Sequence, residues 1–121
     1  MRDWLLRKSF ILHSGDATDC QIECDGLTNE EIETFALLIA RKFTFGKVEG
    51  VPRGGWPIAN ALQKYRRRLA DVRLLVDDVL TTGKSMDQMR ENASDIGVVL
   101  FARGKCPEWI HPVFQIWGTV P

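Results

Sequence analysis

The spacing of apolar positions changes several times along the chain, and each change predicts a different secondary-structure element. Residues 10–27 predict two short strands on either side of a turn at Ser14, Gly15 and Asp16. From residue 32 to residue 43, apolar side chains recur at helical spacing and give one apolar face. Thr28 and Glu31 form a capping-box sequence just before this run, so a helix should begin there and end before Gly46.

The rest of the chain alternates short apolar strands with helical segments. Strands are predicted at residues 47–50, 72–76, 96–102 and 113–117, and helices from about Pro57 to Leu69 and from the turn at 81–85 to about Ala93. Strands that alternate with helices predict an α/β fold, a three-layer sandwich around a mostly parallel central sheet. Residues 1–121 fit a single domain. Within it, residues 1–27 and 104–121 are expected to form a small hood that includes the N-terminal β-hairpin.

Composition narrows the classes of function. Sixteen basic residues balance sixteen acidic ones, so no global charge favours binding to nucleic acid or to a membrane surface. The apolar runs are too short to span a bilayer, and the N-terminal sequence lacks the apolar block of a signal peptide. Cys20, Cys24 and Cys106 form no CxxC pair and are interpreted as reduced thiols of a cytoplasmic protein. With only two histidines, a zinc site is not expected.

The segment LLVDDVLTTGKSM, residues 74–86, carries the chemistry that is easiest to interpret. Its TGKS tail matches the end of a nucleoside-triphosphate P-loop, whose full pattern is GxxxxGK[ST]. The position of the first glycine in that pattern is occupied here by Asp78. A carboxylate would repel the anion and restrict the turn, so the P-loop interpretation is rejected.

A ribose 5-phosphate suits the same segment better. The predicted strand reaches its carboxyl end at Asp77 and Asp78, and ligands of open parallel sheets bind just beyond that end. Residues 81–85 would open a helix, where backbone N–H groups and hydroxyls can hold one phosphate. The two carboxylates stand upstream of that phosphate. They can accept hydrogen bonds from vicinal hydroxyls or hold hydrated Mg²⁺.

These thirteen residues resemble, without a gap, the phosphoribosyl-pyrophosphate (PRPP) signature of type I phosphoribosyltransferases. The segment VPRGG, residues 51–55, is similar to the pyrophosphate loop of the same family. Its two glycines let backbone N–H groups approach a pyrophosphate, and Arg53 can pair with it. Each motif also has a plain structural interpretation, the first as a capped helix after a strand with surface acids and the second as a tight strand-to-helix turn. The occurrence of both on successive strands favours the family.

The resemblance implies a role for each candidate residue. Asp77, Asp78 and Arg53 would be catalytic, and the two aspartates would also hold Mg²⁺ through water. The 5′-phosphate would lie on Thr81, Thr82, Gly83, Lys84 and Ser85, the pyrophosphate on Pro52, Arg53, Gly54 and Gly55, and the base, in the weakest of these assignments, on Arg103, Lys105 and Trp117.

The sequence departs from the family pattern in two places. Residues 10–27 are similar to the first hairpin of orotate phosphoribosyltransferases, but His13 stands where lysine is usual, and the usual aromatic residues near Gln21 and Ile22 are absent. These differences argue against orotate as the base.

The family also inserts two strands and a long flexible lid before the PRPP strand, and the two or three residues after Leu69 leave no room for them. Charges of the missing lid could come from residues 66–68, although a solvated helix face is the plainer interpretation of those arginines.

The resemblance implies a homodimeric enzyme that binds PRPP or a nucleoside 5′-monophosphate and transfers phosphoribose to or from a nitrogenous base with Mg²⁺. Two alternatives stay open because the lid is expected to be missing. One is a non-catalytic module that binds PRPP or a nucleotide, and the other is a phosphoribosyl hydrolase.

Overall fold

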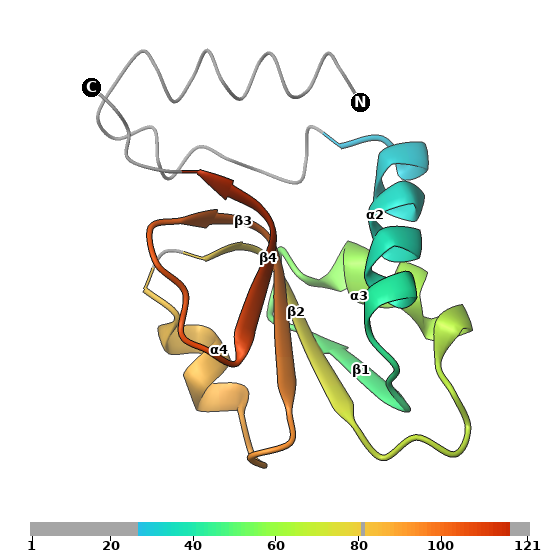
Figure 1. Cartoon of the computed structure of the whole chain (residues 1–121). Coiled ribbons are helices and arrows are strands. Elements are labelled where there is room, and N and C mark those ends of the chain that lie inside the picture. Colours follow the sequence, from blue (N-terminus) through green and yellow to red (C-terminus); the bar gives the residue numbers. More distant parts are fainter. Residues whose placement is uncertain (1–26, 81, 117–121) are drawn as a thin grey trace.

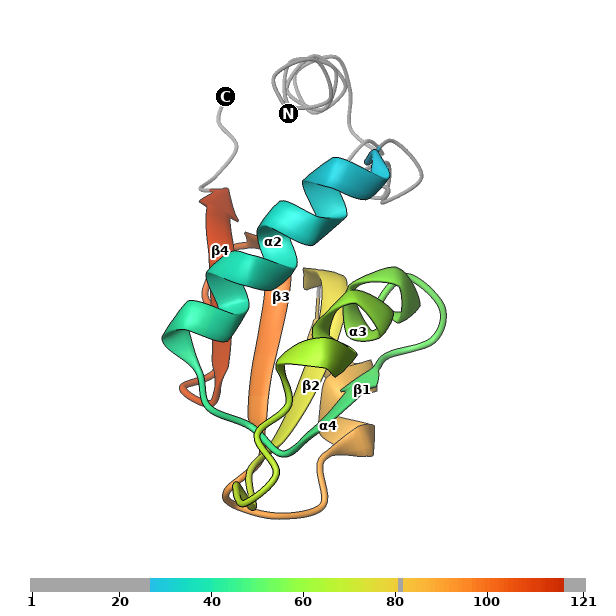
Figure 2. The same cartoon turned by 90° about the vertical axis from the view of Figure 1, so that its right-hand side faces the viewer.

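A four-stranded parallel sheet organises the computed structural model, which describes residues 27–80 and 82–116. The strands β1 (Lys47–Gly50), β2 (Arg73–Leu80), β3 (Ile96–Arg103) and β4 (Ile110–Ile116) lie side by side in chain order. Helices α2 (Asn29–Lys42) and α3 (Trp56–Leu62) cover one face, and α4 (Lys84–Met89) lies on the other (Figure 1, Figure 2). The predicted α/β fold with a parallel sheet is confirmed, and helices on both faces are compatible with a three-layer sandwich.

Helix α2 begins as its sequence predicts. The Glu31 backbone N–H donates to the Thr28 hydroxyl at 3.1 Å, and the Glu31 carboxylate accepts from the Thr28 backbone N–H at 2.8 Å. This capping box satisfies backbone N–H groups that have no partner within the helix. Phe35, Ala36 and Ile39 then turn the buried face of α2 toward the sheet.

Two hydrophobic layers hold the sheet between its helices. The larger lies under α2 and α3, and the smaller lies between the sheet and α4, around Leu75 and Met86. In the larger layer, the rings of Phe101 and Phe114 stack across neighbouring strands with centroids 5.8 Å apart. The Phe35 ring of α2 meets both of them edge-on, at 6.3 and 5.9 Å. The aromatic cluster thereby fixes α2 against β3 and β4.

The helix that follows the glycine-rich loop is shorter than the sequence predicts. Helix α3 ends at Leu62, and a single 3-10 turn, η3 (Gln63–Tyr65), follows it. The predicted end at Leu69 is wrong, since that side chain is 94% exposed. The run from Lys64 to Arg68 offers only Tyr65 as an apolar group, so a longer helix would have no face to bury. Instead, the Arg67 backbone N–H donates to the Phe45 carbonyl at 2.7 Å, just before β1.

Three other ends of helices and strands also differ from those that the sequence predicts. Strand β2 runs on to Leu80 rather than ending at Val76, and β4 begins at Ile110 rather than at Val113. Both extensions follow from pairing with β3, because Leu80 of β2 still pairs with Ala102 and Ile110 of β4 already pairs with Gly97. Helix α4 ends at Met89, so the expectation that it reaches Ala93 is wrong. The predicted N-terminal hairpin lies outside the described residues, and within them no helix has both the length and the apolar character to cross a bilayer.

A buried arginine ties the amino-terminal end of β2 to its surroundings. The Arg73 side chain is 12% exposed and donates to the Asp95 carboxylate at 2.8 Å and to the Met89 carbonyl at 2.7 Å. Asp95 also accepts backbone N–H groups from Glu91 and Asn92. This cluster joins the end of α4 to β2, and the spacing of residues in the sequence gave no sign of it.

Replacing Asp95 by asparagine is expected to cost about 2 kcal/mol of unfolding free energy at pH 7, because a buried charged hydrogen bond is lost. The Arg73 side chain and the two N–H groups hold the pKa of Asp95 well below its usual range. A depressed pKa contributes stability above the unfolded value near 3.8, and this contribution is lost as the pH falls below it. Urea unfolding should therefore show a difference at pH 7 that narrows at pH 3. Glu91→Gln is the control, because that side chain is 72% exposed and lies 3.7 Å from Arg73. Equal stability of Asp95→Asn and parent at pH 7 would contradict the assignment.

Candidate functional site

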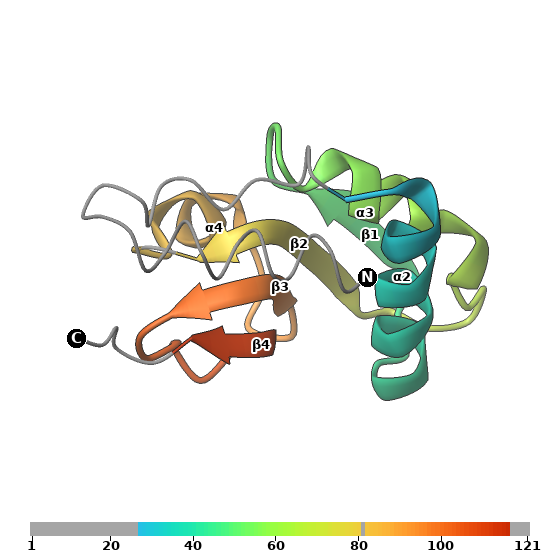
Figure 3. The same ribbon diagram turned by 90° about the horizontal axis from the view of Figure 1, so that it is seen from above.

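Most of the described candidate residues gather at the carboxyl edge of the sheet. Strand β1 pairs with β2 up to Gly50 and Val76, and β2 pairs with β3 up to Leu80 and Ala102. In a parallel sheet these ends point the same way, so the segments that follow β1, β2 and β3 meet at one edge. Figure 3 looks onto this arrangement from above. The sequence motifs, although far apart in the chain, thus share one end of the molecule.

The acidic pair lies within β2 and not after it. The expectation that the strand ends before Asp77 is wrong, because the ladder with β3 continues on both sides of the pair, from Asp77 opposite Val99 to Leu80. Both carboxyls are half-buried. The Asp78 backbone N–H donates to the Asp77 carboxylate at 2.8 Å, and the Val79 N–H donates to the Asp78 carboxylate at 2.8 Å. One hydrogen bond from the strand backbone therefore orients each carboxyl.

Burial raises the pKa of Asp77 to about 8, and the adjacent carboxyl of Asp78 adds to the shift by its hydrogen bond and its charge. Near neutral pH, then, the pair retains a proton that an exposed aspartate would have released. Within residues 27–80 and 82–116, no salt bridge neutralises either carboxyl. Asp95 has a paired arginine that lowers its pKa, whereas Asp77 has no such partner in the part of the chain that the structure describes. An acid pair with a raised pKa at the carboxyl edge of a sheet is typical of a binding site.

The glycine-rich loop after β1 lies directly against this pair. A Cβ atom built on Gly54 would be 2.3 Å from the Asp78 Oδ2 atom, and one on Gly55 would be 2.2 Å from the Val76 carbonyl oxygen. The Val51 backbone N–H donates to that same Val76 carbonyl at 2.8 Å. Only glycine permits this approach. The two glycines thus have a packing role beside the ligand role inferred from the sequence, while Pro52 and Arg53 are exposed.

The turn before α4 has the expected form in its described part. Gly83 has φ +81°, and the Lys84 backbone N–H donates to the Thr82 hydroxyl at 3.2 Å. Thr82, Lys84 and Ser85 are exposed, and Thr81 lies outside the described residues. Because α4 is only six residues long, its dipole is weak. A phosphate here would depend on the N–H groups and hydroxyls of the turn itself.

The structure describes two of the three residues that the sequence assigns to binding the nitrogenous base. Arg103 is the last residue of β3, Lys105 is exposed in the following turn, and Trp117 lies outside the described residues. Gly104 between them has φ +85°. The Gln115 side-chain amide donates to the carbonyls of Ala102 and Gly104 and so fixes this turn. Sequence reasoning missed Gln115, since only the pairing of β4 with β3 brings it there.

The arginines at residues 66–68 lie at the other end of the sheet. They precede β2, and the Arg67 backbone is bonded to Phe45 before the start of β1. The candidate site follows the ends of these strands. Charges at residues 66–68 therefore do not replace those of a lid over it. The connection at 66–72 carries no strand, so the predicted absence of the inserted hairpin is confirmed for this segment.

Metal binding at this edge would depend on two carboxylates. Within the described part of the chain, no group of three histidine, cysteine, aspartate or glutamate side chains could hold an ion. Asp77 and Asp78 offer the hard oxygen donors that Mg²⁺ prefers. This ion commonly keeps several waters and takes further oxygens from a bound phosphate. The donor set therefore fits a magnesium ion that arrives together with its ligand.

Comparison with known proteins gives no independent identification. No protein-family model matches the chain, and no curated protein matches it significantly. The function must accordingly be argued from the site.

Proposed function

We propose that the chain binds PRPP or a nucleoside 5′-monophosphate at the carboxyl edge of its sheet. We further propose that it transfers phosphoribose between PRPP and a nitrogenous base, in the manner of a compact type I phosphoribosyltransferase. The contact between Gly54 and Asp78 carries this proposal. It joins two motifs, each of which resembles a separate half of a PRPP site, into one surface.

Each part of the ligand has a matching group at this edge. The carboxylates of Asp77 and Asp78 suit the two vicinal ribose hydroxyls as acceptors. Exposed Arg53 and the N–H groups of its loop suit a pyrophosphate, and the turn at residues 82–85 suits the 5′-phosphate. Arg103 ends β3 and Lys105 follows it on the adjoining side, where the base would lie.

In the proposed reaction, a ring nitrogen of the base forms a bond to ribose C1 and loses its proton to solvent, while the bond from C1 to the pyrophosphate oxygen breaks. The electron pair leaves with the pyrophosphate. Arg53 would stabilise the charge that develops there, and the two carboxylates would hold the ribose in line. Bound Mg²⁺ would supply further charge neutralisation on the pyrophosphate. In the described structure no lid covers this edge, so water would compete with the base and the rate should be low.

A second candidate function follows from the short connection at residues 66–72, which carries no inserted hairpin and so leaves the site without a lid in the described part of the chain. A PRPP- or nucleotide-binding module without turnover needs no lid. The same openness is compatible with a phosphoribosyl hydrolase. The retained Arg53 favours the enzyme over a sensor of monophosphates, since a monophosphate offers no pyrophosphate for it to pair with.

Calorimetric titration tests the shared premise of these functions. PRPP is titrated with and without Mg²⁺, with ATP as the comparison ligand. We expect Mg²⁺-dependent binding of PRPP and no binding of ATP.

Pyrophosphate release is then followed across a panel of nucleobases. Release that needs a base identifies a transferase, release without a base identifies a hydrolase, and binding without release identifies a sensor. Failure of PRPP and of nucleoside monophosphates to bind would overturn the proposal.

A further inference from the structure

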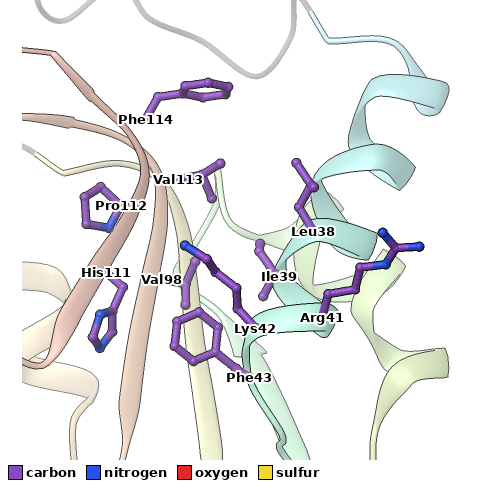
Figure 4. A pocket seen from close by; sticks show the side chains of 10 residues that line it. All are labelled: Leu38, Ile39, Arg41, Lys42, Phe43, Val98, His111, Pro112, Val113 and Phe114. Carbon is purple, nitrogen blue, oxygen red and sulfur yellow. The ribbon is translucent and has the colours of Figure 1, made fainter.

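Helix α2 leaves one corner of the sheet uncovered. It packs against α3 and reaches β3 and β4 through the ring cluster around Phe35. Between its second half and the two strands lies a pocket of about 480 Å³. This volume is within the range of small-molecule sites. Figure 4 shows the pocket from close by, with the lining residues Leu38, Ile39, Arg41, Lys42, Phe43, Val98, His111, Pro112, Val113 and Phe114.

The floor of this pocket is apolar and partly aromatic. Ile39 and Val98 are buried beneath it, and Val113 is half-buried beside them. At one end, the Phe43 and His111 rings pack with their centroids 5.2 Å apart. At the other end, Phe114 keeps 37% of its surface exposed. Such a floor suits a flat apolar body.

The charged residues that line the pocket, Arg41 and Lys42, are both basic. Lys42 extends from α2 toward β3 and β4 in Figure 4, whereas the neighbouring Arg41 points away from the strands. None of the lining residues is acidic. Among the described residues, no carboxylate forms a salt bridge with Lys42. The ammonium group is therefore available to a ligand anion that lies over the floor.

This pocket is separate from the candidate site. Along β4 its lining extends from His111, at the level of Val76, to Phe114, at the level of Val79, but it includes none of the residues assigned to the candidate site. The glycine-rich loop and the turn before α4 do not line it. A ligand here would leave the carboxyl edge of the sheet free.

We infer that this corner is a second binding site, for a small amphipathic anion with a flat apolar body and a single carboxylate-like group. The apolar body would lie on Val98 and Val113, between the rings at either end of the pocket. The anionic group would meet Lys42. Charge complementarity and the aromatic lining support this class of occupant over an uncharged one.

The test uses 2-naphthoate and its neutral isostere 2-naphthamide, followed by NMR shifts of the full-length protein. In the parent we expect saturable shifts at Val98 and Val113, and about fivefold tighter binding of the naphthoate. Lys42→Gln should remove that preference. Arg41→Gln, which loses the same charge one residue away, should keep it. Neither ligand should compete with PRPP.

Several results would overturn the inference. Equal affinity of the two ligands in the parent would show that Lys42 does not recognise the anion. An equal effect of Lys42→Gln and Arg41→Gln would show that the preference for naphthoate comes from the overall positive charge of the region and not from Lys42. If neither ligand binds saturably, or if the NMR shifts are confined to the carboxyl edge of the sheet, the pocket is not a binding site for this class of ligand. Binding that appears only on dilution of the protein would assign the pocket to a second copy of the chain instead.

Discussion

With asparagine in place of both Asp77 and Asp78, PRPP affinity should fall by about a hundredfold or more. Each carboxyl is expected to accept a hydrogen bond from a ribose hydroxyl, and the loss of both together accounts for that factor. The substitution keeps the size and shape of both side chains. Calorimetric titration in Mg²⁺ measures the change, and Asp71→Asn serves as the control because this exposed acid precedes β2 at the opposite edge.

The single substitution Asp77→Asn should raise stability while it lowers affinity. Burial and the neighbouring carboxyl raise the pKa of Asp77 from 3.8 to about 8. For a raised pKa, the stabilising contribution is fully present below pH 4 and is lost as the pH rises to about 8, because the unfolded chain releases its proton first. Asparagine does not titrate, and its amide can donate to Asp78 as a protonated carboxyl does.

Thermal unfolding in metal-free buffer at pH 5 and pH 9 measures this effect. Allowing for the solvent that reaches a half-buried group, we expect Asp77→Asn to gain about 2 kcal/mol at pH 9, or about 6 °C in Tm, and much less at pH 5. A gain in stability combined with a loss of binding would show that the acid pair is retained for its ligand. If the double variant binds PRPP like the parent, the ribose site has been wrongly assigned. If Asp77→Asn is no more stable than the parent at pH 9, the assignment of a raised pKa to Asp77 is wrong.

The sequence predicted elements well where the signal is local. The capping box at Thr28 and Glu31 depends on side chains three residues apart, and the first strand on alternating polar and apolar positions between two glycines. Errors arose where an end is decided by a distant partner. Strand β2 continues past Val76 because β3 lies alongside it, and α3 stops early because the following residues have no apolar face to bury.

The candidate site was predicted as separate motifs, and the structure supplies their relation. Nothing in the sequence shows that Gly54 lies against Asp78, since this contact depends on the parallel register of β1 and β2. The raised pKa of Asp77 has the same origin, because it needs the burial of a strand that local patterns ended too soon. The Arg73–Asp95 cluster was missed for a similar reason, as its members are 22 residues apart.

The two neighbouring glycines should respond to alanine in different ways. Gly55→Ala places its methyl group 2.2 Å from the Val76 carbonyl oxygen and 2.7 Å from the Val51 nitrogen. These backbone atoms cannot move without disturbing β1 and β2, so unfolding free energy should fall by about 3 kcal/mol. Gly54→Ala meets the Asp78 carboxylate instead. That side chain can rotate away, so the fold should lose only about 1 kcal/mol, whereas PRPP affinity should fall by about tenfold or more because a ribose acceptor has moved.

Urea unfolding and PRPP titration of both variants separate packing from binding. A stable Gly54→Ala variant that binds PRPP as tightly as the parent would show that the glycine-rich loop and the acidic pair do not form one site. The proposed function would then lose the contact on which it rests. A Gly55→Ala variant as stable as the parent would instead refute the close approach of the loop to β2. Because the two substitutions are adjacent and chemically identical, a difference between their effects can come only from what each methyl group meets.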